Sequence, residues 1–474
     1  MSWQTFLFHT ITYGILLYSI LLMLCYVFIG AFSISETRNY LNKNSFTDYR
    51  VIASSTEAPS FSILAPAYNE ASTITENVRS LLSLHYNNLE VIIINDGSKD
   101  DSLDRLIEAY DLHKVDFFVN EQLKTKPVRG VYKSHNSVYR KLIVVDKENG
   151  GKADALNVGI NIAKNEYFVC IDVDCVLEQD ALLKLAKPFL ENSKHRVIAA
   201  GGVVRIANSC EIEGGRLVKI NLPKQFLPRV QTLEYIRAFL LARMAWTRLN
   251  GLLLISGAFG AFDREIVIKC GGYNRNTVGE DMELVVRMRR YMEELNEPYR
   301  VTFIPDPLCW TEAPSTYKIL GRQRNRWTRG TIETLRFHKK MFFNPRYGLL
   351  GMLSYPYWLF FEFLAPIIEF IGILGLIFYC ITVGMNYPAL LLIVGVISLG
   401  ILYSLFAIMM EVLTYNQYKQ RKDILRLVVA AILEPLIFHP FVTWSAIRGN
   451  IDILRKHNGW GEMTRKGFGP KKKV

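Results

Sequence analysis

Apolar runs divide this chain into three parts. Residues 5–32 contain no Lys, Arg, Asp or Glu, and a helix rising about 1.5 Å per residue could cross a bilayer core of roughly 30 Å with this segment. From about 60 to 310, short apolar runs alternate with amphipathic stretches, and beyond residue 349 the apolar segments are long again. The pattern predicts a globular domain between two membrane regions.

The middle part has the alternation that is typical of an α/β domain. The amphipathic stretches ASTITENVRSLLSL and KADALNVGINIA lie between strand-like runs. Strands that alternate with helices tend to pair in parallel, so we expect a mainly parallel sheet. Residues 120–140 are polar, contain Pro127 and Gly130, and are expected to form an inserted loop. The strand candidates are FSILAPAY, EVIIIND, LIVVDK, YFVCIDVD, VIAAGGVV and LLLISGAFGAF.

Basic residues predict the orientation of the first membrane segment. Arg38, Lys43 and Arg50 follow it and no Lys or Arg precedes it, so the chain after it should lie in the cytoplasm. The segment lacks the basic start and small-residue cleavage site of a signal peptide. We therefore expect an uncleaved anchor.

The C-terminal apolar segments are less regular. Residues 349–382 are interrupted by Pro356 and Pro366, whereas 387–410 form a clean span. The connector at 383–388 has no basic residue and is expected outside, while the basic loop that follows 387–410 and the basic tail are expected inside. The apolar residues 424–447, which contain two prolines, would then start and finish on the same side, as a re-entrant or interfacial helix pair bent at those prolines.

Two carboxylates within the apolar stretch 349–382 call for an explanation. Glu362 and Glu369 are seven residues apart and so lie on one helix face. Ionisable residues in membrane segments usually face a bundle interior or an aqueous path. An interfacial position for Glu362 is the alternative.

Charge and cysteine content narrow the possible partners. The net charge is +12, but the soluble part has no run of Lys and Arg interleaved with aromatic residues, so we expect no nucleic-acid partner. Much of the basic excess lies beside the apolar segments and at the tail, as expected for loops on the cytoplasmic side of a lipid bilayer. The seven cysteines form no CxxC pair, which argues against a disulfide framework or a zinc site and favours a reducing compartment.

The strand candidate YFVCIDVD ends in Asp172 and Asp174. Ligands bind at the carboxyl ends of parallel strands, and carboxylates are the hard donors that suit Mg²⁺ or Mn²⁺ in phosphate sites. For an isolated pair of this kind, solvated acids at a strand end are the commoner explanation.

Other strand ends carry polar groups of the kind that bind nucleotides. PAYNE places Tyr68 and Glu70 after one strand, and NDGS places Asp96 after another, where its carboxylate could accept from a pyrimidine N–H or simply end the strand. NGGKADALN places two glycines and Lys152 before a helix, a candidate phosphate contact. The Walker and GxGxxG patterns are absent from the sequence, which disfavours ATP and NAD sites of those kinds.

Two further groups precede the C-terminal membrane region. Glu280 and Asp281 begin a helical pattern, either because acids favour a helix N-terminus or because Asp281 acts as a general base. GRQRNRW supplies Gln323, Arg326 and Trp327 on a basic amphipathic stretch. Arg could neutralise a diphosphate and Trp could stack on a sugar, or the stretch could bind anionic lipid headgroups.

Together these motifs amount to a family resemblance. PAYNE, NDGS, GGKADALN, DVD, ED and QRNRW occur in this order. The chain resembles the family 2 inverting glycosyltransferases, specifically the membrane-integrated processive β-glycan synthases that make cellulose, hyaluronan, chitin oligosaccharides or poly-N-acetylglucosamine. The resemblance covers about residues 58–330, and the membrane layout more loosely. One departure is Gly279, which precedes Glu280 where many relatives have threonine.

The resemblance implies a GT-A fold, Rossmann-like with a mainly parallel sheet, and a role for each motif. Asp96 would contact uracil, with Tyr68 and Glu70 near the base and ribose. Asp172 and Asp174 would hold the diphosphate and Mg²⁺ or Mn²⁺. Asp281, next to Glu280, would be the base, and Gln323, Arg326 and Trp327 would cover the diphosphate and the acceptor end.

The implied activity is extension of a β-linked polysaccharide from a UDP-sugar, UDP-glucose or UDP-N-acetylglucosamine, at the inner or plasma membrane. The expected partners are the donor, the growing glycan, the bilayer and export partners. Single-sugar transfer to a lipid carrier and a non-catalytic scaffold in a secretion complex are the alternatives. The expected segments are an anchor (1–33), a cytoplasmic transferase domain (34–315), interface helices (316–348), membrane segments (349–447) and a cytoplasmic tail (448–474).

Overall fold

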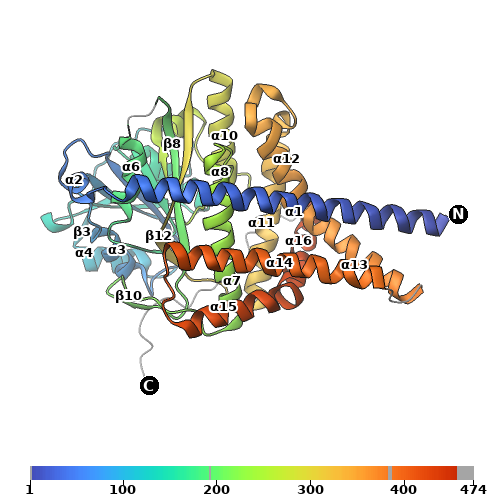
Figure 1. The fold of residues 1–474 in the computed structure, drawn as a ribbon. Helices are drawn as coiled ribbons and strands as arrows, with labels where there is room; N and C mark the ends of the chain where they lie inside the picture. Colours follow the sequence, from blue (N-terminus) through green and yellow to red (C-terminus); the bar gives the residue numbers. More distant parts are fainter. Residues whose placement is uncertain (1–2, 192–193, 383–386, 456–474) are drawn as a thin grey trace. The chain divides into compact units, whose positions relative to one another are not determined.

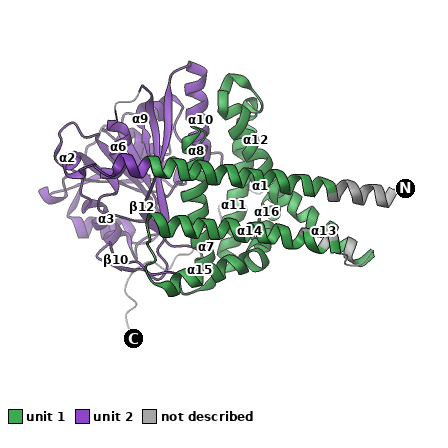
Figure 2. Cartoon of the chain, viewed as in Figure 1, with its two compact units in different colours: residues 1–39, 224–251, 314–463 green, residues 40–223, 252–313, 464–474 purple. Residues whose placement is uncertain are grey.

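The structure is a computed structural model that describes residues 3–191, 194–382 and 387–455. The chain forms two compact units (Figure 2). Unit 1 comprises the described parts of residues 1–39, 224–251 and 314–463, and unit 2 those of residues 40–223, 252–313 and 464–474. The predicted connector at 383–388 lies mostly outside the described residues, as does the tail from residue 456 onwards.

Unit 2 is built on a ten-stranded mixed sheet (Figure 1). The adjacent strands β5, β2, β1 and β6 pair in parallel, as do β8 and β12, while β11 runs antiparallel between β6 and β8. The mainly parallel α/β sheet predicted from the sequence is thus confirmed. In spatial order the strands are β3 (Leu112–Val115), β4 (Val128–Ser134), β5 (Leu142–Lys147), β2 (Leu89–Asn95), β1 (Phe61–Ala67), β6 (Tyr167–Ile171), β11 (Phe259–Asp263), β8 (Arg196–Ile206), β12 (Tyr299–Thr311) and β7 (Val176–Leu177).

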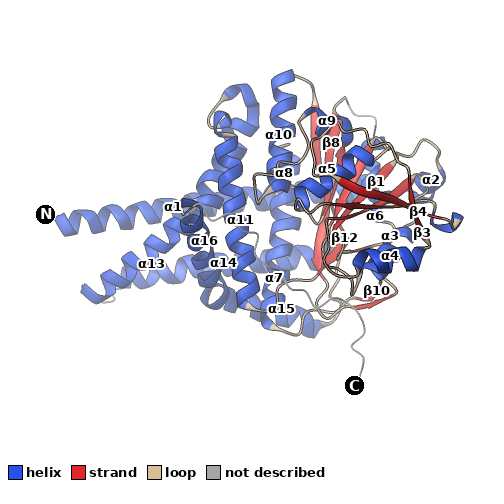
Figure 3. Cartoon of the chain, turned by 180° about the vertical axis from the view of Figure 1, so that it is seen from behind, coloured by secondary structure: helices blue, strands red, loops and turns tan. Residues whose placement is uncertain are grey.

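Helices lie on both faces of this sheet (Figure 3). The chain runs from β1 outward through β2 to β5 and then returns to the other side of β1 as β6, so the order reverses between β1 and β6. Apolar side chains of β1, β2 and β6 are fully buried, among them Ile63, Ile93 and Val169. The helices of 9 to 16 residues in unit 2 are α3 (Ile74–Leu82), α4 (Ser102–Tyr110), α5 (Lys152–Ile162), α6 (Ala181–Leu190) and α10 (Glu280–Leu295).

Two sequence predictions about unit 2 are wrong, and one strand was not predicted. Residues 120–140 are not only a loop, because β4 lies within them and pairs with β3 and β5 around a register shift next to Gly130. The run LLLISGAFGAF forms a strand only from Phe259. β12 was not predicted because prolines are rare inside strands, yet Pro307 is accommodated where the register with β8 shifts.

Unit 1 is helical and contains a segment that we had expected in the transferase domain. Residues 224–251 form α7 (Phe226–Ile236), a π-helical segment η2 (Arg237–Ala242) and α8 (Arg243–Arg248). Their apolar side chains pack against α1 (Trp3–Asn44) and α14 (Tyr387–Thr414) in one cluster. The proposed 34–315 domain is therefore interrupted by this segment. The buried members of the cluster are Ile29, Ile236, Leu240, Leu241, Ala245, Ala407 and Met410.

Four helices in the described part of the chain are long and apolar enough to cross a membrane: Tyr13–Asn44, Leu350–Gly375, Ile393–Thr414 and Arg421–Leu454. Two of them differ from the expectation of breaks at prolines. The second stays helical through Pro356 but has a bend at Leu364, next to Pro366, before α13 (Ala365–Thr382) begins. The fourth continues from α15 (Arg421–Leu433) through the π-helical η7 (Glu434–Phe438) into α16 (His439–Leu454). Extra-wide turns can absorb a proline without ending a helix.

Candidate functional site

The point where strand order reverses carries the first predicted site residues. Tyr68 and Glu70 follow β1, and Asp172 and Asp174 follow β6, the neighbouring strand. In open α/β sheets this is where ligands bind, because adjacent loops there diverge to opposite faces. Tyr68 is 44% exposed and so accessible to a ligand.

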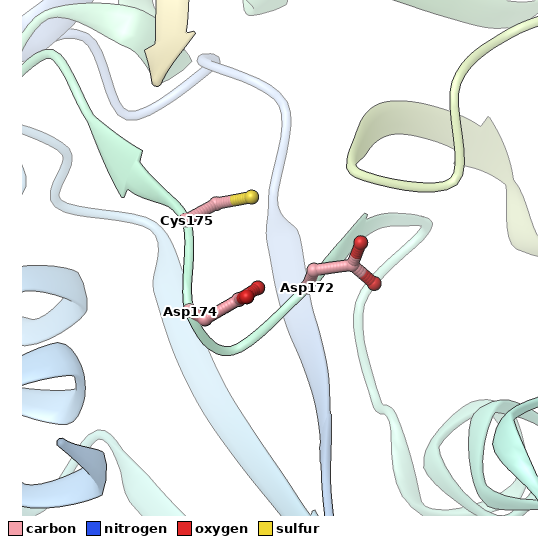
Figure 4. Close-up of side chains that lie close together, drawn as sticks. All are labelled: Asp172, Asp174 and Cys175. Atoms are coloured by element: carbon pink, nitrogen blue, oxygen red, sulfur yellow. The ribbon is translucent and has the colours of Figure 1, made fainter. Parts of the chain in front are cut away.

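Asp172, Asp174 and Cys175 form a possible metal-binding group. One ligand atom of each lies within 4.8 Å of the other two, and Figure 4 shows the three side chains around one short turn. The carboxylates fit the hard-donor preference of Mg²⁺ or Mn²⁺. A hydrogen bond with Cys309 and burial hold the pKa of Cys175 well above its ordinary value, so its neutral thiol suits such an ion poorly.

Lys152, at the start of α5, connects the metal-binding turn to the predicted base. Its ammonium group donates to Asp172 Oδ1 at 2.5 Å and to the Gly257 carbonyl at 3.1 Å. Burial opposes ionisation of Lys152, but the charges of Asp172 and Glu280 outweigh it and raise the lysine pKa. Lys152 is therefore a fixed cation beside the carboxylates.

Asp281, in the first turn of α10, lies on the other side of Gly257. The Gly257 N–H donates to Asp281 Oδ2 at 3.0 Å, and the Met282 N–H donates to Oδ1 at 2.8 Å. The backbone of a single residue, Gly257, thus contacts Lys152 through its carbonyl and Asp281 through its N–H. The sequence analysis did not identify Gly257, because it placed this residue inside the predicted strand LLLISGAFGAF. The pair Ser256-Gly257, which interrupts the apolar run, was a signal that the strand begins only after it.

The Asp96 carboxylate binds the glycine turn that precedes Lys152. Its two oxygens accept from the backbone N–H groups of Gly150, at 3.0 Å, and Gly151, at 2.8 Å. Lys147, which is completely buried, donates to Asp96 at 2.6 Å. The predicted uracil contact and the predicted phosphate contact therefore belong to one connected structure.

A second buried carboxylate completes this arrangement. Asp154 pairs with Lys147 at 2.8 Å and with Arg275 at 3.0 Å. Burial alone would raise the pKa of Asp154, but hydrogen bonds from Lys147, the Lys126 N–H and Arg275 lower it. Neither Lys147 nor Asp154 was predicted, because both lie in segments that also fit ordinary strand and helix patterns.

The loop after β1 is tied to the loop after β2. Asn69 has a left-handed backbone with φ of 57°, and its side chain accepts from the Lys99 N–H at 2.8 Å. The Glu70 N–H donates to Ser102 Oγ at 3.0 Å. These contacts fix the backbone that carries Tyr68 and Glu70.

The remaining predicted residues belong to unit 1. Gln323, Arg326 and Trp327 lie on α11 (Tyr317–Phe337), which confirms the predicted amphipathic helix. Spacings of three and four residues place them on one side of it. Trp327 is 39% exposed.

Comparisons with known proteins agree with the sequence motifs. The model of "Glycosyl transferase family 2" matches residues 62–248, and that of "Glycosyl transferase family group 2" matches residues 167–415. The chain is 29% identical over 282 residues to a poly-β-1,6-N-acetyl-D-glucosamine synthase of Staphylococcus aureus (strain COL), covering 59% of this chain and 56% of that protein. It is 30% identical over 275 residues to the protein of that name from Staphylococcus epidermidis, covering 58% and 55%. The match thus spans little more than half the length of these relatives.

A solved structure supports the fold. The mannosyltransferase PcManGT from Pyrobaculum calidifontis, in complex with GDP-Man and Mn²⁺, superimposes with a TM-score of 0.50 at 17% identity. The similarity covers 86% of this chain and 99% of that one. The GT-A fold predicted from the motifs is therefore confirmed.

Proposed function

Because this chain belongs to glycosyl transferase family group 2, we propose that it is a membrane-bound inverting glycosyltransferase that extends a β-linked polysaccharide from a UDP-sugar. The observation that carries the proposal is the backbone of Gly257, whose carbonyl accepts from Lys152 and whose N–H donates to Asp281. A phosphate-binding cation and a carboxylate base are thereby held next to each other. The names of the relatives favour UDP-N-acetylglucosamine as the donor.

In the proposed reaction Asp281 takes the proton from an acceptor hydroxyl, which attacks the anomeric carbon from the face opposite the leaving group. The attack inverts the configuration, so an α-linked donor gives a β-glycoside. Lys152 stabilises charge on the departing diphosphate. Asp172 and Asp174 would hold Mg²⁺ or Mn²⁺, which supplies further neutralisation of that charge.

The other proposed roles concern binding. Asp96, Tyr68 and Glu70 bind the uridine, and the ties between their loops support this role because they fix the backbone around it. For Gln323, Arg326 and Trp327, the motif itself supports contact with the diphosphate and acceptor. Glu280, 4.0 Å from Lys152, contributes negative charge beside that cation.

A direct assay tests this function. Purified protein in detergent or lipid discs is incubated with UDP-N-acetylglucosamine, UDP-glucose and other UDP-sugars with Mg²⁺ or Mn²⁺, and released UDP and product length are measured. The proposal predicts metal-dependent UDP release and long chains even at early times. A product that stops at one added sugar on a lipid would support the lipid-carrier alternative, and no turnover with any donor would support the scaffold alternative.

A further inference from the structure

A cation covers part of the Trp327 ring in unit 1. The guanidinium carbon of Arg324 lies 4.2 Å from the centroid of the indole, within the distance of about 6 Å over which an aromatic face attracts a cation. The two residues are three positions apart on α11, so the helix brings their side chains together. The contact is thus part of the local helix geometry.

Arg324 is itself held by an ion pair. Its Nη2 donates to Glu234 of α7 at 2.6 Å, and the Arg324 side chain is only 5% exposed. A buried guanidinium is costly unless it has a charged partner. The ion pair with Glu234 therefore explains why the buried guanidinium of Arg324 can stay against the indole ring. Glu234 belongs to residues 224–251, the segment of unit 1 that the sequence analysis had placed in the transferase domain.

The contact also restricts how Trp327 can be used. One face of the indole is covered by Arg324, while 39% of the residue stays exposed. A sugar ring can stack only on the uncovered surface. A ring clamped in this way loses less conformational entropy when a ligand stacks on it than a freely rotating ring would.

We propose that Arg324 is a positioning residue that fixes Trp327 as a one-sided stacking platform for the acceptor glycan, and that Glu234 keeps Arg324 in place. This rests on the proposed function, in which Trp327 binds the acceptor. The QRNRW motif as interpreted above assigns a role to Gln323, Arg326 and Trp327 but none to Arg324 or Glu234. The platform thus needs one motif residue without an assigned role, Arg324, and one residue outside the motif, Glu234.

The test compares product length in Arg324→Met, Arg324→Lys and Glu234→Gln with the wild type at equal UDP release. Arg324→Lys keeps the charge but lacks the planar fork, and it remains informative if Arg324→Met fails to fold. The control is Arg336→Met, which removes an exposed arginine from the same helix. Arg324→Met should shorten the mean chain by about 2- to 30-fold, the range of a cation–π contact, and Arg324→Lys and Glu234→Gln should shorten it less. The KM for the UDP-sugar should stay within about twofold, because the donor contacts are untouched.

A double-mutant comparison separates positioning from a merely structural ion pair. In a Trp327→Ala background, Arg324→Lys should have no further effect on chain length. Unchanged length in the Arg324 variants, or an undiminished effect without Trp327, would overturn the proposal. If either of these outcomes occurs while the wild type makes polymer and Trp327→Ala shortens it, only the role of Arg324 is refuted and the proposed function stands. A wild type that makes no polymer refutes the proposed function, and this inference with it.

Discussion

At the residue scale, the motifs identified candidate side chains but did not predict how these side chains are connected. The spacing of DVD and ED placed Asp172 and Asp281 at a strand end and a helix start, and the structure has both there. Gly257 contacts Asp281 and Lys152, the ion-pair partner of Asp172, while Lys147 pairs with Asp96, and the partners in each contact lie far apart in the sequence. Such contacts depend on the assembled sheet, so no local pattern could have identified them.

Lys147 provides a test of this network. Lys147→Met leaves Asp96 and Asp154 buried with one cation fewer, and breaking a buried ion pair costs about 3–5 kcal/mol. We expect the free energy of unfolding to fall by this order in a urea titration, and the affinity for UDP to weaken because the turn at Gly150 loses its support. Lys219→Met, at a side chain that is 59% exposed, is the control. A Lys147 variant as stable as this control would show that the network does not support the site.

At the element scale, the sequence predicted elements well where one pattern dominated. The continuous apolar runs of β1, β2, β5, β6 and β8 and the amphipathic α3, α5 and α11 were recognised. β12 was hidden by its prolines, and β4 by its polar residues at the edge side of the sheet. The segment α7–η2–α8 was assigned to the transferase domain, whereas it belongs to unit 1. The sequence could not distinguish the two, because a helix has the same apolar pattern whether it packs on a sheet or on membrane helices.

The ion pair between Arg237 and Glu434 should hold this segment within unit 1. Arg237 Nη1 donates to Glu434 Oε2 at 2.8 Å and to Ser404 Oγ at 2.7 Å, which connects η2, η7 and α14. We expect Glu434→Gln to lower the midpoint of thermal unfolding in detergent, because Arg237 then loses its counter-charge. Exchanging the two residues, Arg237→Glu with Glu434→Arg, should recover part of the loss. A double variant no better than the single ones would contradict a direct pairing.

At the scale of the whole molecule, the sequence predicted a transferase domain between membrane segments, and the structure divides the chain into two compact units. The boundaries of the units differ from those of the predicted domains at residues 224–251. This segment belongs to unit 1 because of its packing contacts, although its position in the sequence lies within the predicted transferase domain. The orientation across the membrane is still a prediction from basic residues. It places unit 2 in the cytoplasm.

Cysteine labelling tests that orientation. In a cysteine-free background, Tyr387→Cys should react with an impermeant maleimide added to intact cells, whereas Lys422→Cys and Leu454→Cys should not, since basic residues flank both latter positions. All three side chains are exposed in the structure. Labelling of Leu454→Cys from outside would mean that Arg421–Leu454 crosses the membrane and is not re-entrant.

The proposal that Asp281 is the catalytic base is tested most directly by Asp281→Asn. Asparagine has nearly the same shape and can still accept from the Gly257 N–H, but it cannot take a proton from the acceptor. Glycan formation should fall by about 10²–10⁴-fold, while the UDP affinity measured by calorimetry stays near that of the wild type. A variant that retained more than about a tenth of the wild-type rate, with chemistry rate-limiting, would contradict the assignment.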